Sequence, residues 1–222
     1  MLESLLDLDT RLLLAINGAS SPFGDSFMWN YTQIVVWIPM LLTVVYVIAK
    51  NNKLRDSLLL VVCLALTFVL ADQISSSFFK PTFQRLRPTH DPALAELVRV
   101  VNDYRGGRFG FVSGHAANSF AALTFCALVI RSWKFTVPLT LWALVNCWSR
   151  MYLGVHYPGD IICGALVGVF SGIVTYGLFL LGEKYLFKQS YKVAYKSVSL
   201  INAVFLASVA VLLVLATIEV YL

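Results

Sequence analysis

The chain has 222 residues, of which 59% are apolar and only 13% charged, with a formal net charge of +5 at pH 7. Its mean hydropathy is positive, at +0.76. This composition is typical of an integral membrane protein and excludes an ordinary soluble globular domain. The cysteines lie inside apolar segments without metal-ligand spacing, so we expect neither a disulfide nor a zinc site from Cys63, Cys126, Cys147 and Cys163.

The first 20 residues predict an amphipathic helix that lies on the membrane surface. Leucine and isoleucine side chains recur there at helical spacing, opposite the acidic residues Glu3, Asp7 and Asp9. These acids, and the lack of a basic leading region and of a small-residue cleavage site, disfavour a signal peptide. We therefore expect residues 1–20 to form an interfacial helix.

Six later segments are long and apolar enough to cross a bilayer, because a spanning helix needs about 20 residues. They are 27–49, 57–79, 114–131, 134–153, 160–182 and 197–221. Only helices and closed barrels satisfy their backbone hydrogen bonds in lipid, and these segments lack the polar alternation of barrel strands. The sequence thus predicts an all-α, polytopic membrane protein in which residues 1–222 form one six-helix domain.

Six spans divide the loops between two sides of the membrane. Loops 50–56, 132–133 and 183–196 share one side, and loops 80–113 and 154–159 share the other. Most basic residues outside the 80–113 loop lie on the first side, which is typical of the cytoplasmic face: Lys50, Lys53, Arg55, Arg131, Lys134, Lys184, Lys188, Lys192 and Lys196. The pattern therefore predicts a bacterial inner-membrane protein whose 80–113 and 154–159 loops face the periplasm or the outside.

The 80–113 loop is long for a compact bundle, and loops of this length are usually functional or disordered. Asp91 and Pro92 resemble an N-cap and a first helical residue, and an apolar stripe follows them, so we expect a short surface helix. The stripe consists of Leu94, Leu97, Val98 and Val101. Arg105 and Arg108 flank two glycines in a basic turn and are candidates for binding an anionic head group.

Three polar motifs belong to the predicted external side. Residues 80–88 follow the second span, residues 113–115 precede the third, and residues 149–160 join the fourth to the fifth. Because the third and fourth spans run down and back, residues 114 and 153 return to the same level of the membrane. We therefore expect the three motifs to meet in one pocket.

Phosphate is the ligand that these motifs favour. Arginine presents a planar fork and lysine a compact charge, so Lys80, Arg87 and Arg150 together form a candidate phosphate site. Ser113 and Gly114 open a helix, where unpaired backbone N–H groups and the helix dipole attract an anion.

Two histidines supply the reactive groups that the cleavage of a phosphate ester needs. His156 can act as the nucleophile and form a phosphohistidine, with Asp160 accepting from its other ring nitrogen. His115 can protonate the leaving oxygen and then deprotonate water. Neither a metal nor another cofactor is implied.

The motifs resemble those of the type 2 phosphatidic acid phosphatase superfamily, whose pattern is K-x6-R-P, then P-S-G-H, then S-R-x5-H-x3-D. The resemblance covers residues 80–160 and departs at Val112, where the family usually has proline. It implies a membrane phosphatase with His156 as nucleophile, Asp160 as its partner and His115 as acid and base. It also implies the phosphate-binding set Lys80, Arg87, Ser113, Gly114 and Arg150.

Asp72 lies eight residues before Lys80 and therefore on nearly the same helix face, about 12 Å deeper. Two interpretations stay open. Asp72 supports the site from a second layer of residues or lines a polar cavity, or it has no role in the site and is protonated or exposed to water.

We therefore expect a lipid phosphatase that acts on a phosphorylated membrane lipid, without nucleic acid or a known protein partner. By the resemblance, the substrates include undecaprenyl diphosphate, phosphatidate, phosphatidylglycerophosphate and lipid A phosphates, and the extra loop arginines favour a diphosphate or lipid A. Two alternatives stay open. A phosphotransferase would pass the phosphate from the same histidine to a lipid hydroxyl, and a transporter or binding protein would use the basic pocket for recognition alone.

Overall fold

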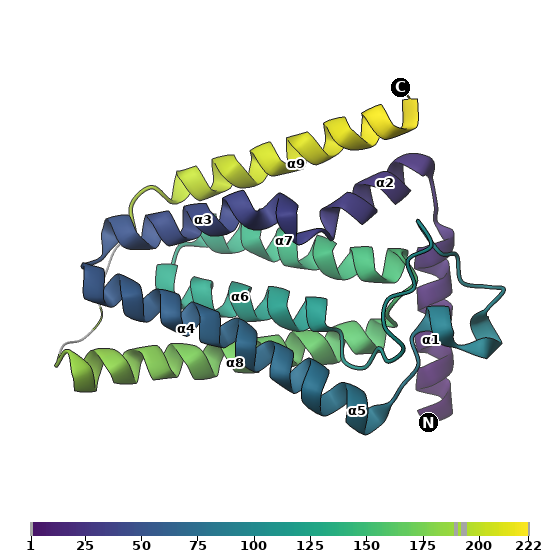
Figure 1. Cartoon of the computed structure of the whole chain (residues 1–222), viewed down its shortest axis with the longest axis horizontal. Helices are drawn as coiled ribbons and strands as arrows, with labels where there is room; N and C mark the ends of the chain where they lie inside the picture. Colours follow the sequence, from purple (N-terminus) through teal and green to yellow (C-terminus); the bar gives the residue numbers. More distant parts are fainter. Residues whose placement is uncertain (1, 189–190, 192–194, 222) are drawn as a thin grey trace.

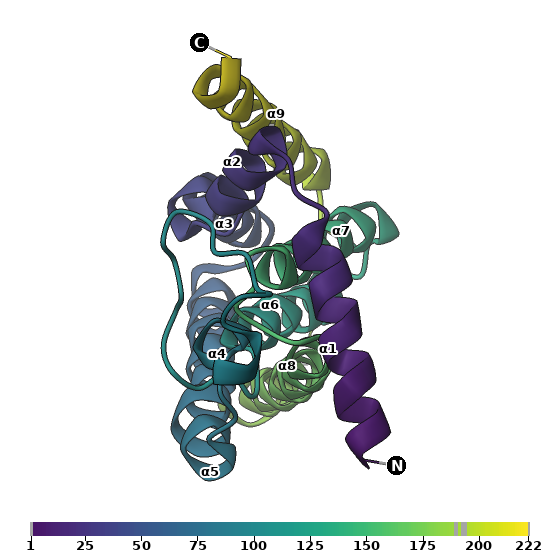
Figure 2. The ribbon, with the colours of Figure 1, turned by 90° about the vertical axis from the view of Figure 1, so that its right-hand side faces the viewer.

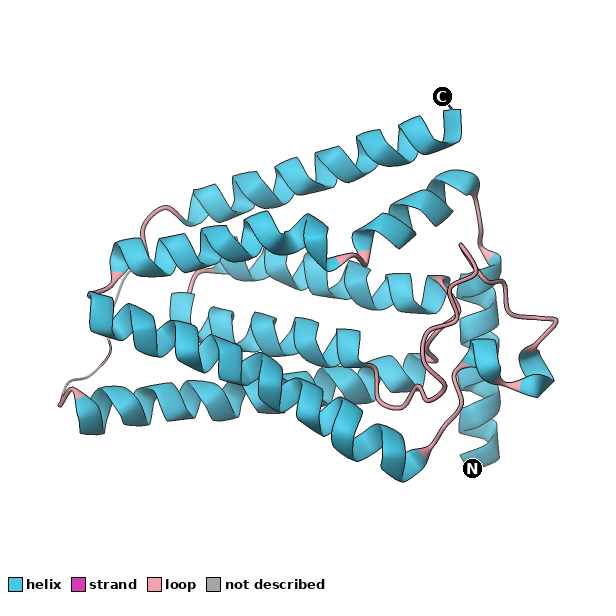
Figure 3. Cartoon of the chain, in the orientation of Figure 1, coloured by secondary structure: helices cyan, strands magenta, loops and turns pink. Residues whose placement is uncertain are grey.

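Long helices make up most of the computed structural model, which describes residues 2–188, 191 and 195–221 (Figure 1). No strand occurs within those ranges, and one isolated bridge pairs Leu86 with Phe109 (Figure 3). The all-α prediction is thus confirmed. Of the predicted loop 183–196, residues 189–190 and 192–194 lie outside the described residues, Lys192 among them.

The helices follow one another with short connections, apart from the segments between α5 and α6 and between α8 and α9. In chain order they are α1 (Leu2–Gly18), α2 (Pro22–Tyr31), α3 (Ile34–Asn51), α4 (Leu54–Asp72), α5 (Lys80–Phe83), α6 (Gly114–Ile130), α7 (Trp133–Tyr152), α8 (Pro158–Leu186) and α9 (Val198–Tyr221). A π-helical stretch, Gln73–Phe79, joins α4 to α5, and the 3₁₀ turns Pro88–His90 and Pro92–Leu94 lie in the long loop.

Four described helical stretches are long and apolar enough to cross a membrane: Ile34–Asn51, Leu54–Phe83, Pro158–Leu186 and Val198–Tyr221. The apolar α6 is shorter, at 17 residues, and the 20-residue α7 carries polar groups that include Asn146 and Arg150. Six spans were expected, so length and apolar character alone support a multi-pass membrane protein but not that number.

The predicted span 27–49 is interrupted, because α2 ends at Tyr31 and α3 begins at Ile34. The indole nitrogen of Trp37 donates to the Tyr31 carbonyl at 2.7 Å, so that a side chain uses the carbonyl that a continuous helix would pair with an amide. The Tyr31 hydroxyl in turn donates to the carbonyl of Trp142 on α7 at 3.2 Å. The break places Thr32 at the end of the bundle where the motifs lie.

Glycines let α8 pack very closely against α6. A Cβ added at Gly164 would lie 2.5 Å from the Ser113 carbonyl oxygen, and one added at Gly168 would lie 2.3 Å from that of Ala117. Gly172, four residues further on, approaches Ala121 in the same way. Such spacing of small residues permits close contact of helix backbones. It therefore holds the start of α8 beside the start of α6.

The helix α1 covers most of the predicted segment 1–20 and runs across the end of the bundle (Figure 2). Leu13 is fully buried against the long loop, whereas Leu2, Leu5, Leu6 and Leu12 are exposed. Asn17 anchors the helix at its C-terminal end: its amide nitrogen donates to the carbonyls of Arg99 and Tyr152, and its oxygen accepts from the Arg99 amide.

The prediction of a surface helix after Asp91 is wrong in length, because the helical turn there is much shorter than expected. The Asp91 carboxylate does accept from the Ala93 amide at 3.0 Å, as an N-cap does, but only the 3₁₀ turn Pro92–Leu94 follows. Leu94 and Val98 are buried in a cluster with Leu13 and Tyr157, while Leu97 is exposed. The path of this segment is thus determined by its packing against α1, and not by the helical spacing of its apolar residues.

Candidate active site

The three motifs lie at one end of the bundle, where the chain passes from α5 into the long loop, from that loop into α6, and from α7 into α8 (Figure 1). The close packing of α6 on α8 joins two of them directly, because the Ser113 amide donates to the Asp160 carbonyl oxygen at 3.0 Å. The motifs lie far apart in the sequence. They meet because the chain runs away from this end of the bundle in one helix and comes back to it in the next.

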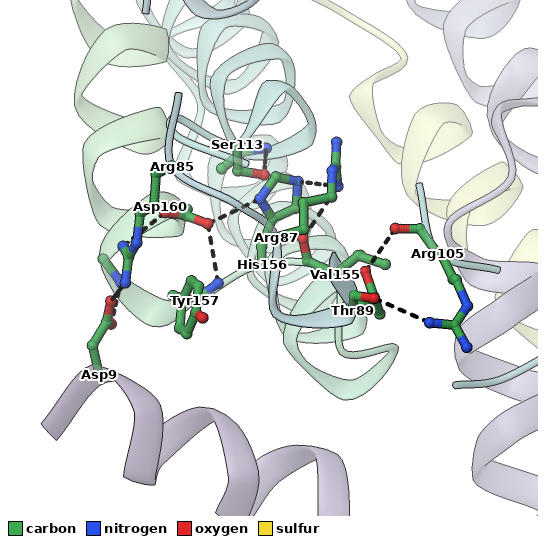
Figure 4. A network of polar contacts seen from close by, with 12 residues as sticks. Asp9, Arg85, Arg87, Thr89, Arg105, Ser113, Val155, His156, Tyr157 and Asp160 are labelled. Carbon is green, nitrogen blue, oxygen red and sulfur yellow. Dashed lines mark hydrogen bonds and ion pairs between the residues drawn. The ribbon is translucent and has the colours of Figure 1, made fainter. Parts of the chain in front are cut away.

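His156 lies in the short connection before α8 and is almost completely buried. Its Nδ1 is 3.3 Å from Oδ2 of Asp160, an oxygen that also accepts from the Tyr157 amide at 3.1 Å. On its other side, Nη1 of Arg87 is 2.9 Å from His156 Nε2 (Figure 4). Arginine is only a donor, so Nε2 must be the acceptor and Nδ1 must carry the proton that points to Asp160.

The charge of the surroundings keeps this imidazole neutral. Burial, together with the cations of Arg87, Arg150 and Lys80, lowers the pKa of His156 well below its ordinary value. A neutral imidazole whose Nε2 lone pair faces the guanidinium of Arg87, a predicted phosphate ligand, has the chemistry of a nucleophile.

Arg87 belongs to a tight corner of the long loop. Its amide donates to the Arg108 carbonyl at 3.0 Å, and its guanidinium donates to the Val155 carbonyl at 3.2 Å. Gly106 has a left-handed backbone, with φ of +66°, and a Cβ there would lie 3.1 Å from the guanidinium carbon of Arg87. The loop therefore holds this guanidinium beside His156.

Arg150 is buried near the end of α7. Its guanidinium donates to the Thr32 hydroxyl at 2.7 Å and to the Tyr104 hydroxyl at 3.0 Å, while its Nε has no hydrogen-bond partner among the described residues. Thr32 and Tyr104 were not predicted. No sequence signal marks them, because they come from the break between α2 and α3 and from the long loop.

Lys80 ends a polar chain along one helix face. Its Nζ donates to the Ser76 hydroxyl at 3.2 Å, and that hydroxyl donates to Asp72 at 3.1 Å. A Cβ at Gly114 would lie 3.8 Å from the Lys80 nitrogen, so the lysine points to the start of α6. The structure thus connects the exposed Asp72 to Lys80 through Ser76.

Ser113 and His115 flank the first residue of α6. The Ser113 hydroxyl caps the helix by accepting from the Ala116 amide at 3.4 Å, and His115 is partly buried in the first turn. Val112, where the family motif usually has proline, is fully buried. Gly114 and the helix N-terminus therefore face the same end of the bundle as Lys80.

The structure does not bring the side chains of Arg105 and Arg108 into contact with this cluster. Arg105 donates to the Thr89 carbonyl at 3.1 Å, and the Thr89 hydroxyl donates to the Arg105 carbonyl at 2.8 Å (Figure 4). Arg108 is exposed and lies 5.5 Å from the ring centre of Phe109. The pairing of Arg105 with Thr89 braces the loop.

Two unpredicted residues complete the cluster, Arg85 and Asp9. Arg85 donates through Nη1 to Oδ1 of Asp160 at 2.9 Å and through Nη2 to Oδ2 of Asp9 at 2.7 Å (Figure 4). Arg85 lies within the 80–88 motif, which is the one signal that pointed to it. Asp9 lies on α1, which the sequence connects to no motif.

Histidine, cysteine and carboxylate side chains nowhere gather in threes in a way that could hold a metal ion, as far as the described chain extends. Around His156 the cations Lys80, Arg87 and Arg150 gather, a set that suits an anion, while the carboxylates of Asp9 and Asp160 are held by Arg85.

Comparison with known proteins agrees with this chemistry. The model of the PAP2 superfamily matches residues 57–182, more than half of the chain and all three motifs. The chain belongs to the PAP2 superfamily. This is the family that the motifs resemble, and membership together with the two relatives described next identifies the chain as a lipid phosphatase.

Two curated relatives are similar over most of their length. The chain is 45% identical over 177 residues to a lipid A 4′-phosphatase of Bacteroides thetaiotaomicron, with 79% of each chain covered. It is 34% identical over 181 residues to a lipid A 4′-phosphatase of Porphyromonas gingivalis, with 81% of this chain and 76% of the relative covered. Among solved structures, that of Aquifex aeolicus LpxE has the same fold, with a TM-score of 0.58, 24% identity, and 77% and 95% of the two chains covered.

Proposed function

We propose that this PAP2 protein removes a phosphate group from a membrane lipid through a phosphohistidine at His156. The supporting observation is the neutral imidazole held between Asp160, which accepts from Nδ1, and Arg87, which donates to Nε2. A phosphate oxygen that replaces Nε2 as the acceptor of Arg87 would bring phosphorus in front of the nucleophile.

In the first step, Nε2 of His156 forms a bond to phosphorus and the ester P–O bond breaks. His115 gives its proton to the departing lipid oxygen. In the second step, His115 takes a proton from water, the water oxygen attacks phosphorus, and the N–P bond breaks to release phosphate. Lys80, Arg87 and Arg150 bind the phosphate oxygens together with Ser113 and the Gly114 amide, and so stabilise the charge of the transition state.

A lipid tail has an apolar path beside this site. A cavity of about 320 Å³ lies between α6, α7 and α8 and is lined by Phe120, Leu144, Cys147, Ile161, Ile162, Ala165, Leu166 and Val169. Ile161 directly follows Asp160, so the cavity begins next to the catalytic turn. We propose that the tail approaches sideways along this cavity while the phosphate enters the basic pocket.

For the placement in the membrane, we propose six spans, with α6 and α7 crossing as the third and fourth and α1 lying at the interface. The basic residues of the opposite loops support an orientation in which the motifs face the periplasmic or external side of a bacterial inner membrane.

The substrate that we favour is a lipid A phosphate, since the two curated relatives described above, which are 45% and 34% identical to this chain, are named lipid A 4′-phosphatases. Undecaprenyl diphosphate is the competing substrate from the sequence, and phosphate transfer to a lipid hydroxyl is the competing reaction.

The test is the release of phosphate by purified protein from lipid A, undecaprenyl diphosphate and phosphatidate, each in mixed micelles. We expect lipid A to give the highest kcat/KM, and we expect His156→Ala to abolish release while the protein still folds. Release from undecaprenyl diphosphate alone would reject the lipid A assignment. Equal activity of His156→Ala would reject the nucleophile, and transfer of label to lipid without free phosphate would favour the phosphotransferase.

A further inference from the structure

Asp9, on a helix outside all three motifs, is tied to the catalytic carboxylate through one arginine. The two terminal nitrogens of Arg85 bind Asp9 and Asp160 separately, at 2.7 and 2.9 Å. The guanidinium carbon also lies 3.9 Å from the ring centre of Tyr157. A planar guanidinium can bridge two carboxylates while stacking on a ring, and a lysine ammonium cannot.

Asp9 also holds the helix that carries Asp160. Its Oδ1 accepts from the Gly159 amide at 2.7 Å, and this amide is one of the unpaired donors at the start of α8. A Cβ at Gly159 would lie 3.0 Å from Oδ2 of Asp9, so glycine makes this close approach possible. One carboxylate thus caps the first turn of α8 and anchors Arg85.

Both carboxylate oxygens of Asp160 then have partners. Oδ1 receives Arg85, while Oδ2 receives the Tyr157 amide and faces Nδ1 of His156. Without Asp9, Nη2 of Arg85 would lose the one partner that it has among the described residues, and the guanidinium could turn on the Tyr157 ring and draw the carboxylate away from the imidazole.

We infer that Asp9 is a positioning residue for the proposed reaction, acting through Arg85 and Asp160 on the orientation of His156. The inference rests on the proposed function, because it needs His156 as the nucleophile. By this inference α1 contributes a residue to the active site, although it lies outside the three motifs.

The measurement is steady-state kinetics of Asp9→Asn against Asp7→Asn. Asp7 is a matched control, because it lies on the same helix but pairs with Arg11 on the exposed face. For Asp9→Asn we expect kcat to fall about 10-fold to 100-fold, as expected for a misplaced catalytic group, with KM changed less than about 2-fold. Asp7→Asn should match the wild type.

A double-mutant cycle locates the effect. Arg85→Gln should lower kcat at least as much as Asp9→Asn, and the double variant should be no worse than Arg85→Gln alone, because both changes break one chain of contacts. With p-nitrophenyl phosphate, whose leaving group needs no proton, the loss should persist, since His156 must still attack.

Three results would overturn the inference: a wild-type kcat for Asp9→Asn, a rise in KM at unchanged kcat, or equal losses in Asp7→Asn and Asp9→Asn. If Asp9→Asn does not fold, Asp9→Ser decides the matter in the same assay, because a hydroxyl still accepts from Gly159 but lacks the charge that anchors Arg85. A wild-type protein that releases phosphate from no ester would overturn the proposed function itself, and the positioning role with it.

Discussion

At the scale of single residues, the site consists of a neutral imidazole surrounded by cations. Desolvation and three basic side chains act in the same direction on His156 and keep the proton off its Nε2. The same cations would attract a phosphate group. In the proposed mechanism, a single arrangement would therefore bind the anion and keep the nucleophile in its reactive form.

This arrangement predicts how stability depends on pH. Below about pH 6.5 the unfolded chain protonates His156 and the folded protein does not, so the unfolded state binds more protons and stability falls as pH falls. Between pH 7.5 and 5 the wild type should lose about 2 kcal/mol more than His156→Asn. Unfolding in detergent, followed across that range, measures the difference. Parallel curves for the two proteins would show that the pKa of His156 is the same in the folded and unfolded states, and would contradict the lowered pKa.

At the scale of elements, the active end depends on how α8 docks against α6. The glycines on α8 bring its backbone against that of α6, and the hydrogen bond from Ser113 to the Asp160 carbonyl closes the contact at the catalytic end. A misplaced α8 would move Asp160 and the adjoining histidine together.

A substitution at the helix contact should therefore impair both stability and activity. Gly168→Val places a side chain where even a Cβ would lie 2.3 Å from the Ala117 carbonyl oxygen, so we expect lower thermal stability and at least about a 10-fold loss of kcat. Gly177→Val is the matched control, because a Cβ at Gly177 meets nothing within 4 Å. Thermal unfolding and phosphate release test the pair, and equal effects of the two would contradict the close-packing account.

At the scale of the whole molecule, the helices return every motif to one end, and α1 closes that end from the side (Figure 2). The opposite end carries basic residues such as Lys53, at the start of α4. Catalysis and the proposed orientation in the membrane are thus linked, because all reactive groups would face one compartment.

Labelling by a membrane-impermeant thiol reagent tests this orientation. Arg108→Cys should react in intact cells whose outer membrane has been permeabilised, since Arg108 is exposed beside the active end. Lys53→Cys, exposed at the other end, should react only after the inner membrane is opened. Variants without the native cysteines provide the background, and the reverse labelling pattern would reject the proposed topology.

The sequence by itself determined the helical class, the apolar segments, the spacing of the motifs and the family. These features are local or periodic: a run of apolar residues predicts a helix in lipid, and His156 and Asp160 are close in the sequence and meet where the chain enters α8. It did not predict the break after Tyr31, the irregular path after Leu94, or the Arg85 bridge to Asp9.

Only the tertiary structure decided those features, because their partners are far apart in the chain. The contacts of Arg85 with Asp160 and with Asp9 span 75 and 76 residues, and that of Gly159 with Asp9 spans 150. Arg150 finds Thr32 across 118 residues. No periodicity encodes such pairs, since they depend on how α1 and the long loop pack on the end of the bundle. The residues that hold the carboxylate of Asp160 come from that packing.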